Sequence, residues 1–317
     1  MLKLIVRQTR QASPLIRSLR LAPAEGAPLP SFGPGAHLKI HVPGLAEPRC
    51  YSLMGFAAAD FEQPGHYQLG VRLEDNSQGG SRHMHALAEG DVIEAEPPRN
   101  DFPLHAAEAG EAPVVLIAGG IGITPIAAMA ATLAHAARPY RLHYCGRSRA
   151  QLAFLDELRA LAGDALAVHA DDENPLDLAG LLAQAGPASH VYVCGPKGLI
   201  DAVIAATGDW PEGRVHFELF TPAAAQEGDQ AFEVELRQSG KVLTVPADKT
   251  ILDVLEAAGC DPLYDCKRGE CGVCQATVLE GLPDHRDYYL SEAEKAGGQV
   301  IQVCISRSKT PRLVLDL

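Results

Sequence analysis

Four cysteines near the C-terminal end of the chain constrain its fold more than any other feature. They are Cys266, Cys271, Cys274 and Cys304. The first three lie in C-K-R-G-E-C-G-V-C, which has the spacing C-x4-C-x2-C, and the fourth follows much later. This is the plant-type ferredoxin spacing, in which four thiolates hold a [2Fe–2S] cluster. Gly269 and Gly272 allow backbone N–H groups to turn toward the sulfur atoms, and we expect Cys304 to complete the site from a strand.

Two other uses of these cysteines are less well supported. A structural zinc site usually has paired, short Cys/His spacings. Disulfides are disfavoured because the N-terminal segment, M-L-K-L-I-V-R-Q, has too short an apolar run for a signal peptide. We therefore expect a cytoplasmic protein whose 8 cysteines remain thiols or metal ligands.

The composition restricts the possible partners and the number of domains. A formal net charge of −13 argues against nucleic acid as a partner. No apolar run reaches the roughly 18 residues that would suggest a membrane span. A chain of 317 residues exceeds one ordinary core, so we expect two or three domains. Nothing in the sequence requires more than a monomer.

Three regimes of sequence pattern follow one another. Short alternating segments such as His37–Val42 and His66–Arg72, separated by Gly and Pro, predict an antiparallel barrel. The buried run Val114–Ala118 and the strand–helix alternation that follows predict a parallel α/β domain. We place the predicted boundaries as follows: barrel 1–104, α/β domain 105–222, linker 223–230 and cysteine-bearing domain 231–317.

A glycine-rich turn, Gly119–Pro125, joins the first predicted parallel strand to an alanine-rich helix. Thr124 is placed to cap the helix, and Pro125 suits its first position. Such a turn allows close approach of a pyrophosphate, which a helix N-terminus favours. A tight connection without a ligand is the alternative, because the segment is not the G-x-G-x-x-G fingerprint. The segment Cys194-Gly195-Pro196 ends another strand at the same edge; Cys194 either contacts a nicotinamide or is a small buried hydrophobe.

The barrel also carries a group of residues that suit a flavin. Arg49 can bind a phosphate through two hydrogen bonds, and the amides of Gly79-Gly80-Ser81, with the Ser81 hydroxyl, can complete a cradle. Tyr51 can pack along a ring system, and the Ser52 hydroxyl can donate to a flavin nitrogen. Each residue alone is ordinary, since arginines are usually solvated and tyrosines usually buried in a core. The inference depends on the combination.

Taken in chain order, these motifs resemble the phthalate dioxygenase reductase family. They are R-x-Y-S from Arg49, G-G-S from Gly79, G-G-I-G-I-T-P from Gly119, C-G-P from Cys194, H-F-E-x-F from His216 and the cysteine motif. The resemblance covers essentially the whole chain. It implies an FMN-binding barrel, an NAD(H)-binding α/β domain and a C-terminal β-grasp ferredoxin domain. It also implies a Rieske-type non-haem iron oxygenase, acting on small aromatic compounds, as the protein that accepts the electrons.

The resemblance also assigns roles to individual residues. It implies FMN contacts from Arg49, Tyr51, Ser52, Gly80 and Ser81, with the backbone of Val71 and Arg72 along the flavin's pyrimidine edge. It implies NADH contacts from Gly120, Thr124, Cys194, Gly195 and Pro196. Phe220 would lie near the flavin ring where the nicotinamide enters, and a core residue at a domain interface is an equal alternative. Ser52, Thr124, Cys194 and Phe220 are thereby the residues expected nearest the reacting rings.

The implied activity is the transfer of electrons from NADH through FMN to the [2Fe–2S] cluster and on to the oxygenase. Arg147-Ser148-Arg149 follows the second parallel strand, and an arginine there can accept the 2′-phosphate of NADPH. An NADPH-preferring reductase is therefore one alternative. The others are a stand-alone flavin or ferredoxin reductase, a nicotinamide-dependent sensor without turnover, and a zinc-binding structural protein.

Overall fold

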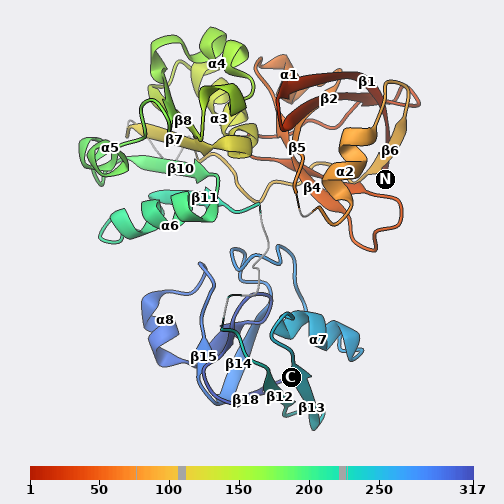
Figure 1. Cartoon of the computed structure of the whole chain (residues 1–317), viewed down its shortest axis with the longest axis vertical. Coiled ribbons are helices and arrows are strands. Elements are labelled where there is room, and N and C mark those ends of the chain that lie inside the picture. The colour runs from red at the N-terminus through yellow and green to blue at the C-terminus, as the bar shows by residue number, and fades with distance from the viewer. Residues whose placement is uncertain (76, 106–111, 221–225, 227) are drawn as a thin grey trace. The chain divides into compact units, whose positions relative to one another are not determined.

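The computed structural model describes residues 1–317 except 76, 106–111, 221–225 and 227 (Figure 1). The chain divides into two compact units, Met1–Glu218 and Leu219–Leu317. The first unit contains the predicted barrel and the predicted parallel sheet, and the second contains the four motif cysteines. The predicted linker, 223–230, falls partly on residues 223–225 and 227, which lie outside the described residues.

The N-terminal part of the first unit is a closed barrel of six antiparallel strands in the order β1-β2-β5-β4-β3-β6. The strands are β1 (Leu2–Ser13), β2 (Ile16–Pro23), β3 (His37–His41), β4 (Arg49–Met54), β5 (Tyr67–Arg72) and β6 (Val92–Ala95). Pairing of Leu2 with Ala95 closes the barrel between β1 and β6. Two short helices lie in its connections, α1 (Ala59–Glu62) and α2 (Gly80–Ala86).

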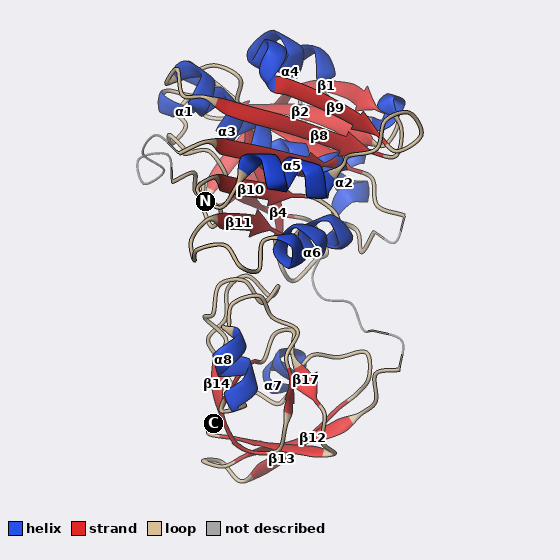
Figure 2. Ribbon diagram, turned by 90° about the vertical axis from the view of Figure 1, so that its left-hand side faces the viewer, coloured by secondary structure: helices blue, strands red, loops and turns tan. Residues whose placement is uncertain are grey.

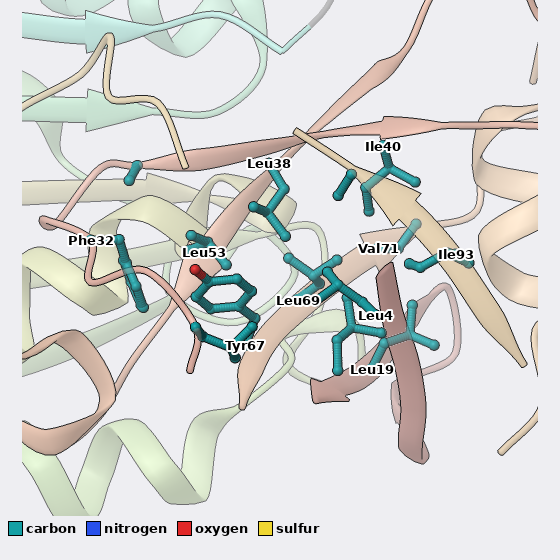
Figure 3. Close-up of a cluster of buried hydrophobic side chains, with 14 of the residues drawn as sticks. Leu4, Leu19, Phe32, Leu38, Ile40, Leu53, Tyr67, Leu69, Val71 and Ile93 are labelled. Carbon is teal, nitrogen blue, oxygen red and sulfur yellow. The ribbon is translucent and has the colours of Figure 1, made fainter. Parts of the chain in front are cut away.

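Alternation along the strands fills the barrel interior with branched and aromatic side chains (Figure 3). The labelled members are Leu4, Leu19, Phe32, Leu38, Ile40, Leu53, Tyr67, Leu69, Val71 and Ile93. Ala128 and Ala131 belong to the same buried cluster. Both come from a helix of the neighbouring α/β part, and their small side chains allow that helix to pack closely on the barrel.

The rest of the first unit is a five-stranded sheet in the order β11-β10-β7-β8-β9, in which every pair is parallel. Its strands are β7 (Val114–Gly119), β8 (Tyr140–Gly146), β9 (Leu166–Ala170), β10 (His190–Cys194) and β11 (Val215–Glu218). Its helices are α3 (Ile123–His135), α4 (Leu155–Ala162), α5 (Leu178–Ala185) and α6 (Lys197–Ala206). Figure 1 shows α3 and α4 on one side of the sheet and α6 on the other.

The second unit has a mixed sheet in the order β13-β12-β18-β14-β16 (Figure 2). Its strands are β12 (Phe232–Leu236), β13 (Lys241–Val245), β14 (Gln275–Glu280), β16 (Val300–Gln302) and β18 (Arg312–Leu315). A small ribbon pairs β15 (Pro283–Asp284) with β17 (Arg307–Ser308), and the helices are α7 (Ile251–Ala257) and α8 (Glu292–Gly297). Only the β12–β18 pair is parallel among those of the sheet. The apolar faces of α7 and of the sheet enclose the core.

Asp229 belongs to the folded second unit, although the sequence placed it in the linker. Its carboxylate accepts hydrogen bonds from Arg286, at 2.9 Å from Nη1 and 2.5 Å from Nη2. Arg307 lies beside the same carboxylate and donates to the backbone carbonyls of Lys249, Gln230 and Pro246. These contacts lower the pKa of Asp229 to about 2, chiefly through the hydrogen bonds from Arg286.

Candidate functional site

Three of the residues predicted to bind a flavin meet where β4 begins. A Cβ built on Gly80 would lie 2.9 Å from Cγ of Arg49 and 3.3 Å from the hydroxyl oxygen of Tyr51. Gly80 is also the first residue of α2, so the helix can begin against these two side chains only because this position has no Cβ. The structure therefore brings Arg49, Tyr51 and Gly80 together, as a phosphate-binding and ring-packing group requires.

The segment before α2 is held by serine hydroxyls. Ser77 Oγ accepts hydrogen bonds from the N–H groups of Gly79, at 3.2 Å, and Arg82, at 3.4 Å. Ser81 Oγ accepts from the N–H of Glu74, at 3.2 Å. Arg49 donates from Nη1 to the carbonyls of Glu47 and Pro48. Since a guanidinium carries five N–H donors, these bonds orient Arg49 while leaving donors for a phosphate.

Other predicted flavin contacts lie on the neighbouring strands. Burial raises the pKa of Tyr51 to about 12, so its hydroxyl is neutral and can donate. Ser52 is buried on β4. The side chain of Val71 lies in the barrel core (Figure 3), so its contact with a ligand would have to use backbone. Its carbonyl accepts from Nε2 of His85, at 2.8 Å. Arg72 ends the same strand and lies 3.5 Å from Glu74.

The glycine turn and the Cys194-Gly195-Pro196 segment pack backbone against backbone at the carboxyl edge of the parallel sheet. A Cβ on Gly119 would lie 2.6 Å from Cδ of Pro196, and one on Gly195 would lie 2.9 Å from Cα of Gly119. Gly120 has φ +55°, and nothing lies within 4 Å of its Cβ position. The sheet order reverses at β7, and open α/β sheets bind ligands at this switch point. The two predicted nucleotide segments therefore form one site.

The predicted capping role of Thr124 is wrong. The N-cap position of α3 is Gly122, without a side-chain hydrogen bond. Thr124 is the second helical residue, and Pro125, which was predicted at the first position, is the third. The Thr124 hydroxyl lies over the preceding turn and donates to the carbonyl of Ile121, at 3.0 Å. Its methyl group, Cγ2, lies 2.8 Å from the Cβ position of Gly70 on β5. Thr124 therefore joins the glycine turn to the barrel within the first unit.

The two further predicted contacts, Cys194 and Phe220, belong to different units. Cys194 is fully buried at the end of β10. Phe220 is half-buried, two residues after β11 ends, and is grouped with the second unit. The N–H of the preceding residue, Leu219, donates to Glu270 Oε1 of the cysteine loop, at 2.6 Å. The position of Phe220 beside a flavin stays a prediction.

The four motif cysteines gather into one site. Cys266 is hydrogen-bonded to the side chains of Cys304 and Cys271, and Cys304 also to that of Cys274. The pKa of Cys266 is lowered, chiefly by the hydrogen bond from Cys304. The N–H of Arg268 donates to Cys266 Sγ at 3.3 Å, and Cys274 Sγ donates to Oε1 of Gln302 at 3.3 Å. Cys304 lies in a turn after β16, so the expectation that it comes from a strand is wrong.

Left-handed backbone conformations form the loop that carries three of these cysteines. Lys267 has φ 54°, Gly269 has φ 76° and Gly272 has φ 75°. A Cβ on Gly269 would lie 2.7 Å from Cγ2 of Ile305, and one on Gly272 would lie 2.3 Å from Cζ of Tyr289. Both glycines are therefore required by conformation and by space. The tight loop turns the N–H of Arg268 toward sulfur, as a thiolate cluster needs.

The arrangement of the thiols fits a two-iron cluster. Among the described residues, no group of three or more His, Cys, Asp or Glu side chains is arranged to hold a single metal ion. In a [2Fe–2S] centre each iron takes two of the four cysteines, so no iron needs three protein ligands. The four associated sulfurs, with the inward N–H of Arg268, match that ligand set. Cys266, Cys271, Cys274 and Cys304 would hold the cluster.

Comparison with known proteins identifies the domains. Residues 234–309 match the model of the 2Fe-2S iron-sulfur cluster binding domain, and residues 116–204 match that of the oxidoreductase NAD-binding domain. The chain is 40% identical to vanillate O-demethylase oxidoreductase of Pseudomonas sp. (strain HR199 / DSM 7063), over 100% of both chains. It is 40% identical to phthalate dioxygenase reductase of Burkholderia cepacia, over 95% of this chain and 93% of that protein.

The chain belongs to the phthalate dioxygenase reductase family. A solved phthalate dioxygenase reductase, described as a modular structure for electron transfer from pyridine nucleotides to [2Fe-2S], matches with a TM-score of 0.72 and 37% identity. The match covers 100% of this chain and 98% of that one. Other members of the family are named as reductase subunits of monooxygenase systems. In the described ranges, no helix is both long and apolar enough to cross a membrane.

Sequence reasoning missed three residues that shape these family sites. Glu270 lies between the first two cysteines of the motif, and the sequence indicated no role for it. Its carboxylate accepts a hydrogen bond from the N–H of Leu219 and lies 3.1 Å from Nε of Arg268. Gln302 accepts from Cys274, and Ser77 organises the approach to α2. The Ser-x-Gly-Gly-Ser pattern beginning at Ser77 was a usable signal for the last of these. For Glu270 and Gln302, the sequence contains no comparable signal.

Proposed function

We propose that this protein is the NADH-dependent reductase component of a Rieske-type oxygenase system that hydroxylates or demethylates small aromatic compounds. One combination supports the proposal. A single chain of this family contains both the glycine turn that suits a dinucleotide and four cysteines with the spacing of a plant-type ferredoxin. A nicotinamide delivers two electrons together, whereas a [2Fe–2S] cluster accepts one. A flavin held by the barrel residues would supply the exchange between two-electron and one-electron transfer.

The barrel residues suit the binding of FMN. Arg49 would bind the phosphate, helped by the backbone N–H groups of Gly80 and Ser81. Tyr51, neutral at physiological pH, would pack along the isoalloxazine ring or ribityl chain, and Ser52 would donate to a ring nitrogen. The backbone of Val71 and Arg72 would line the pyrimidine edge. FMN is favoured over FAD because the ferredoxin domain comes last, the order that the resemblance associates with FMN.

The sheet edge suits NADH. The turn at Gly120 would receive the pyrophosphate, and Cys194-Gly195-Pro196 would border the nicotinamide. Thr124 would contribute by holding the turn against β5, since its hydroxyl is already bonded to Ile121. Phe220 would lie where the nicotinamide enters. No proton donor or acceptor is needed there, because hydride transfer between the rings moves no separate proton.

The cysteine loop is the proposed exit for electrons. Val273, between two motif cysteines, has 47% of its surface exposed, so the loop is accessible within its own unit. The acceptor would be the terminal oxygenase protein, with the reductase acting as a cytoplasmic monomer.

An anaerobic titration of the purified, cofactor-loaded protein with NADH tests the proposal. We expect both flavin and iron–sulfur absorbance to bleach, and complete reduction to need more than one equivalent of NADH. Bleaching of the flavin alone would contradict an internal electron path. A colourless, zinc-rich preparation would support the structural alternative, and loss of flavin on gel filtration would support a flavin reductase that releases its product.

A second measurement tests which class of oxygenase accepts the electrons. We expect the reduced protein to support turnover of a purified Rieske oxygenase on an aromatic substrate, with no turnover when the reductase lacks its cluster. A haem-dependent oxygenase assayed in parallel supplies the contrast. Turnover of the haem enzyme alone would refute the Rieske assignment while leaving the reductase activity intact.

A further inference from the structure

A basic segment and an acidic segment lie side by side beyond the ends of β8 and β9. Arg147 and Arg149 follow β8, and Asp171, Asp172 and Glu173 follow β9. The strands are parallel neighbours, with Gly146 opposite Ala170. The N–H of Asp171 donates to the carbonyl of Gly146, at 2.9 Å, so the acidic segment turns toward the basic one. Neither segment has a role in the proposed function.

Glu173 occupies the hydrogen-bonding edge of Arg149. Nε and Nη2 of Arg149 both donate to Oε2 of Glu173, at 3.2 and 3.1 Å. That edge is one of those with which a guanidinium can bind a phosphate through two bonds. The side chains keep 44% and 50% of their surface exposed, so the pair contributes little to stability. While the pair is formed, however, the Nε/Nη2 edge of Arg149 is not available to a phosphate.

The turn that carries Glu173 is fixed independently of Arg149. The N–H groups of Glu173 and Asn174 both donate to the carbonyl of Ala170, at 2.9 and 2.8 Å. The Asn174 side chain accepts from the N–H of Ala170, at 3.2 Å, and donates to the carbonyl of Val168, at 2.9 Å. The backbone that carries Glu173 is therefore fixed by bonds in which Arg149 takes no part.

This edge is where the adenosine half of a dinucleotide would lie. The region matched by the NAD-binding domain model, residues 116–204, includes both segments. With the pyrophosphate at the turn after β7 and the nicotinamide toward β10, the adenosine extends toward β8 and β9. At such a position a carboxylate hydrogen-bonds the 2′-hydroxyl of NADH, whereas an arginine accepts the 2′-phosphate of NADPH.

We infer that Glu173 is a specificity-determining residue, which selects NADH by holding Arg149 away from a 2′-phosphate and presenting a carboxylate to the 2′-hydroxyl. The inference rests on the proposed NADH site and names the residues that set its selectivity. A 2′-phosphate carries about −1.5 to −2 charges at neutral pH. Next to the Glu173 carboxylate it is repelled, while Arg149 is already paired with that carboxylate.

The test is the substitution Glu173→Gln in the cofactor-loaded protein. Glutamine keeps the size of the side chain but removes its charge, and with it the ion pair with the Arg149 guanidinium. We expect the ratio of kcat/KM for NADPH to that for NADH to rise by about tenfold or more. The gain should appear as a lower KM for NADPH, and the KM for NADH should rise because the carboxylate for the 2′-hydroxyl is lost. In the double variant Glu173→Gln/Arg149→Ala the gain should disappear.

Asp172→Asn is the matched control. Asp172 is an exposed neighbour on the same turn, and it forms no ion pair with any residue that the structure describes. Its substitution makes the same change in net charge. An equal rise in the ratio for Asp172→Asn, or a gain that survives Arg149→Ala, would show a general charge effect and overturn the inference. An unchanged ratio in Glu173→Gln would overturn it as well.

A binding measurement separates this inference from the proposed function. Adenosine 2′,5′-bisphosphate should bind Glu173→Gln about tenfold more tightly than it binds the wild type, as measured by calorimetry without any electron transfer. If NADH reduces neither protein but this difference in binding is found, the proposed function fails and the inference stands. If NADH reduction is normal and the two affinities are equal, the inference alone fails.

Discussion

A Cβ on Gly122 would stand 2.0 Å from the carbonyl oxygen of Cys194 and 2.4 Å from its carbonyl carbon. The atoms in the way are backbone atoms of a central strand, which cannot swing aside as a side chain can. The contact joins the start of α3 to the end of β10. It therefore sets the spacing between the place proposed for the pyrophosphate and the place proposed for the nicotinamide.

Gly122→Ala should separate these two segments and weaken NADH binding. Overpacking of this kind costs about 1–3 kcal/mol, so we expect KM for NADH to rise by about tenfold or more with FMN and cluster content unchanged. Gly198→Ala on α6 is the control, because nothing lies within 4 Å of its Cβ position. Steady-state kinetics measure the KM for NADH, and the visible spectrum measures the FMN and cluster content. A normal KM in Gly122→Ala would show that the two segments do not form one NADH site.

Arg49→Ala should lower the affinity for FMN. A hydrogen bond to a charged group contributes about 1.5–3 kcal/mol, so we expect the Kd for FMN to rise by roughly 10- to 100-fold. Arg49→Lys should recover part of the affinity, since it restores charge without the paired geometry. Fluorescence titration of the apoprotein gives the Kd. Arg20→Ala, on β2 of the same barrel, should leave it unaltered; an equal loss there would point to net charge and not to a phosphate contact.

Cys271→Ser should remove the iron–sulfur absorbance while NADH still bleaches the flavin. A serine in the place of a ligand thiolate weakens the cage, whereas the barrel and the parallel sheet belong to the other unit. Cys260→Ser is the matched control, since Cys260 lies outside the motif, 3.9 Å from Nζ of Lys241. Iron and sulfide analysis with visible spectroscopy measures the result. A full cluster in Cys271→Ser would exclude Cys271 as a ligand.

The first unit should lose stability as pH falls from about 6.5 toward 4. Burial lowers the pKa of His216 to about 4, with smaller effects from His105 and His190. Burial also lowers that of His143 to about 4, aided by His169 and Arg141. Because the folded pKa is depressed, these histidines gain protons on unfolding, so their contribution is full above about pH 6.5 and lost below it.

Urea unfolding followed by fluorescence can measure this effect. Trp210, the single tryptophan of the chain, reports on the first unit. Since both rings keep some contact with water, we expect about 1 kcal/mol or less per histidine between pH 7 and pH 5. His216→Gln should flatten the dependence, and His135→Gln, at an exposed helix end, should not. A urea midpoint of unfolding that is independent of pH in the wild type would contradict the prediction.

Sequence alone predicted the elements that are short, buried and bounded by Gly or Pro. The predicted segments His37–Val42, His66–Arg72 and Val114–Ala118 coincide to within one residue at each end with β3, β5 and β7. In each case the apolar pattern and the residues that end the element agree, so local sequence and tertiary packing favour the same structure.

The elements that depend on distant contacts were not predictable in this way. The segment Gly79-Gly80-Ser81 was interpreted as part of a phosphate cradle, and the sequence did not predict that Gly80 begins α2, where it packs on Arg49 of β4. Asp229 stood in a stretch without periodicity, and only the folded chain shows that Arg286 binds it. The cysteine spacing predicted which thiols associate, but not that Cys304 lies in a turn or that Glu270 bonds to Leu219.

Both ends of the chain are built into sheets. Leu2 pairs with Ala95 to close the barrel, and β18, near the other end, lies between β12 and β14 in the middle of its sheet. Deleting residues 312–317 would divide that sheet in two, and deleting the first five residues would open the barrel. For protein engineering, any truncation or fusion therefore has to leave the strands Leu2–Ser13 and Arg312–Leu315 whole.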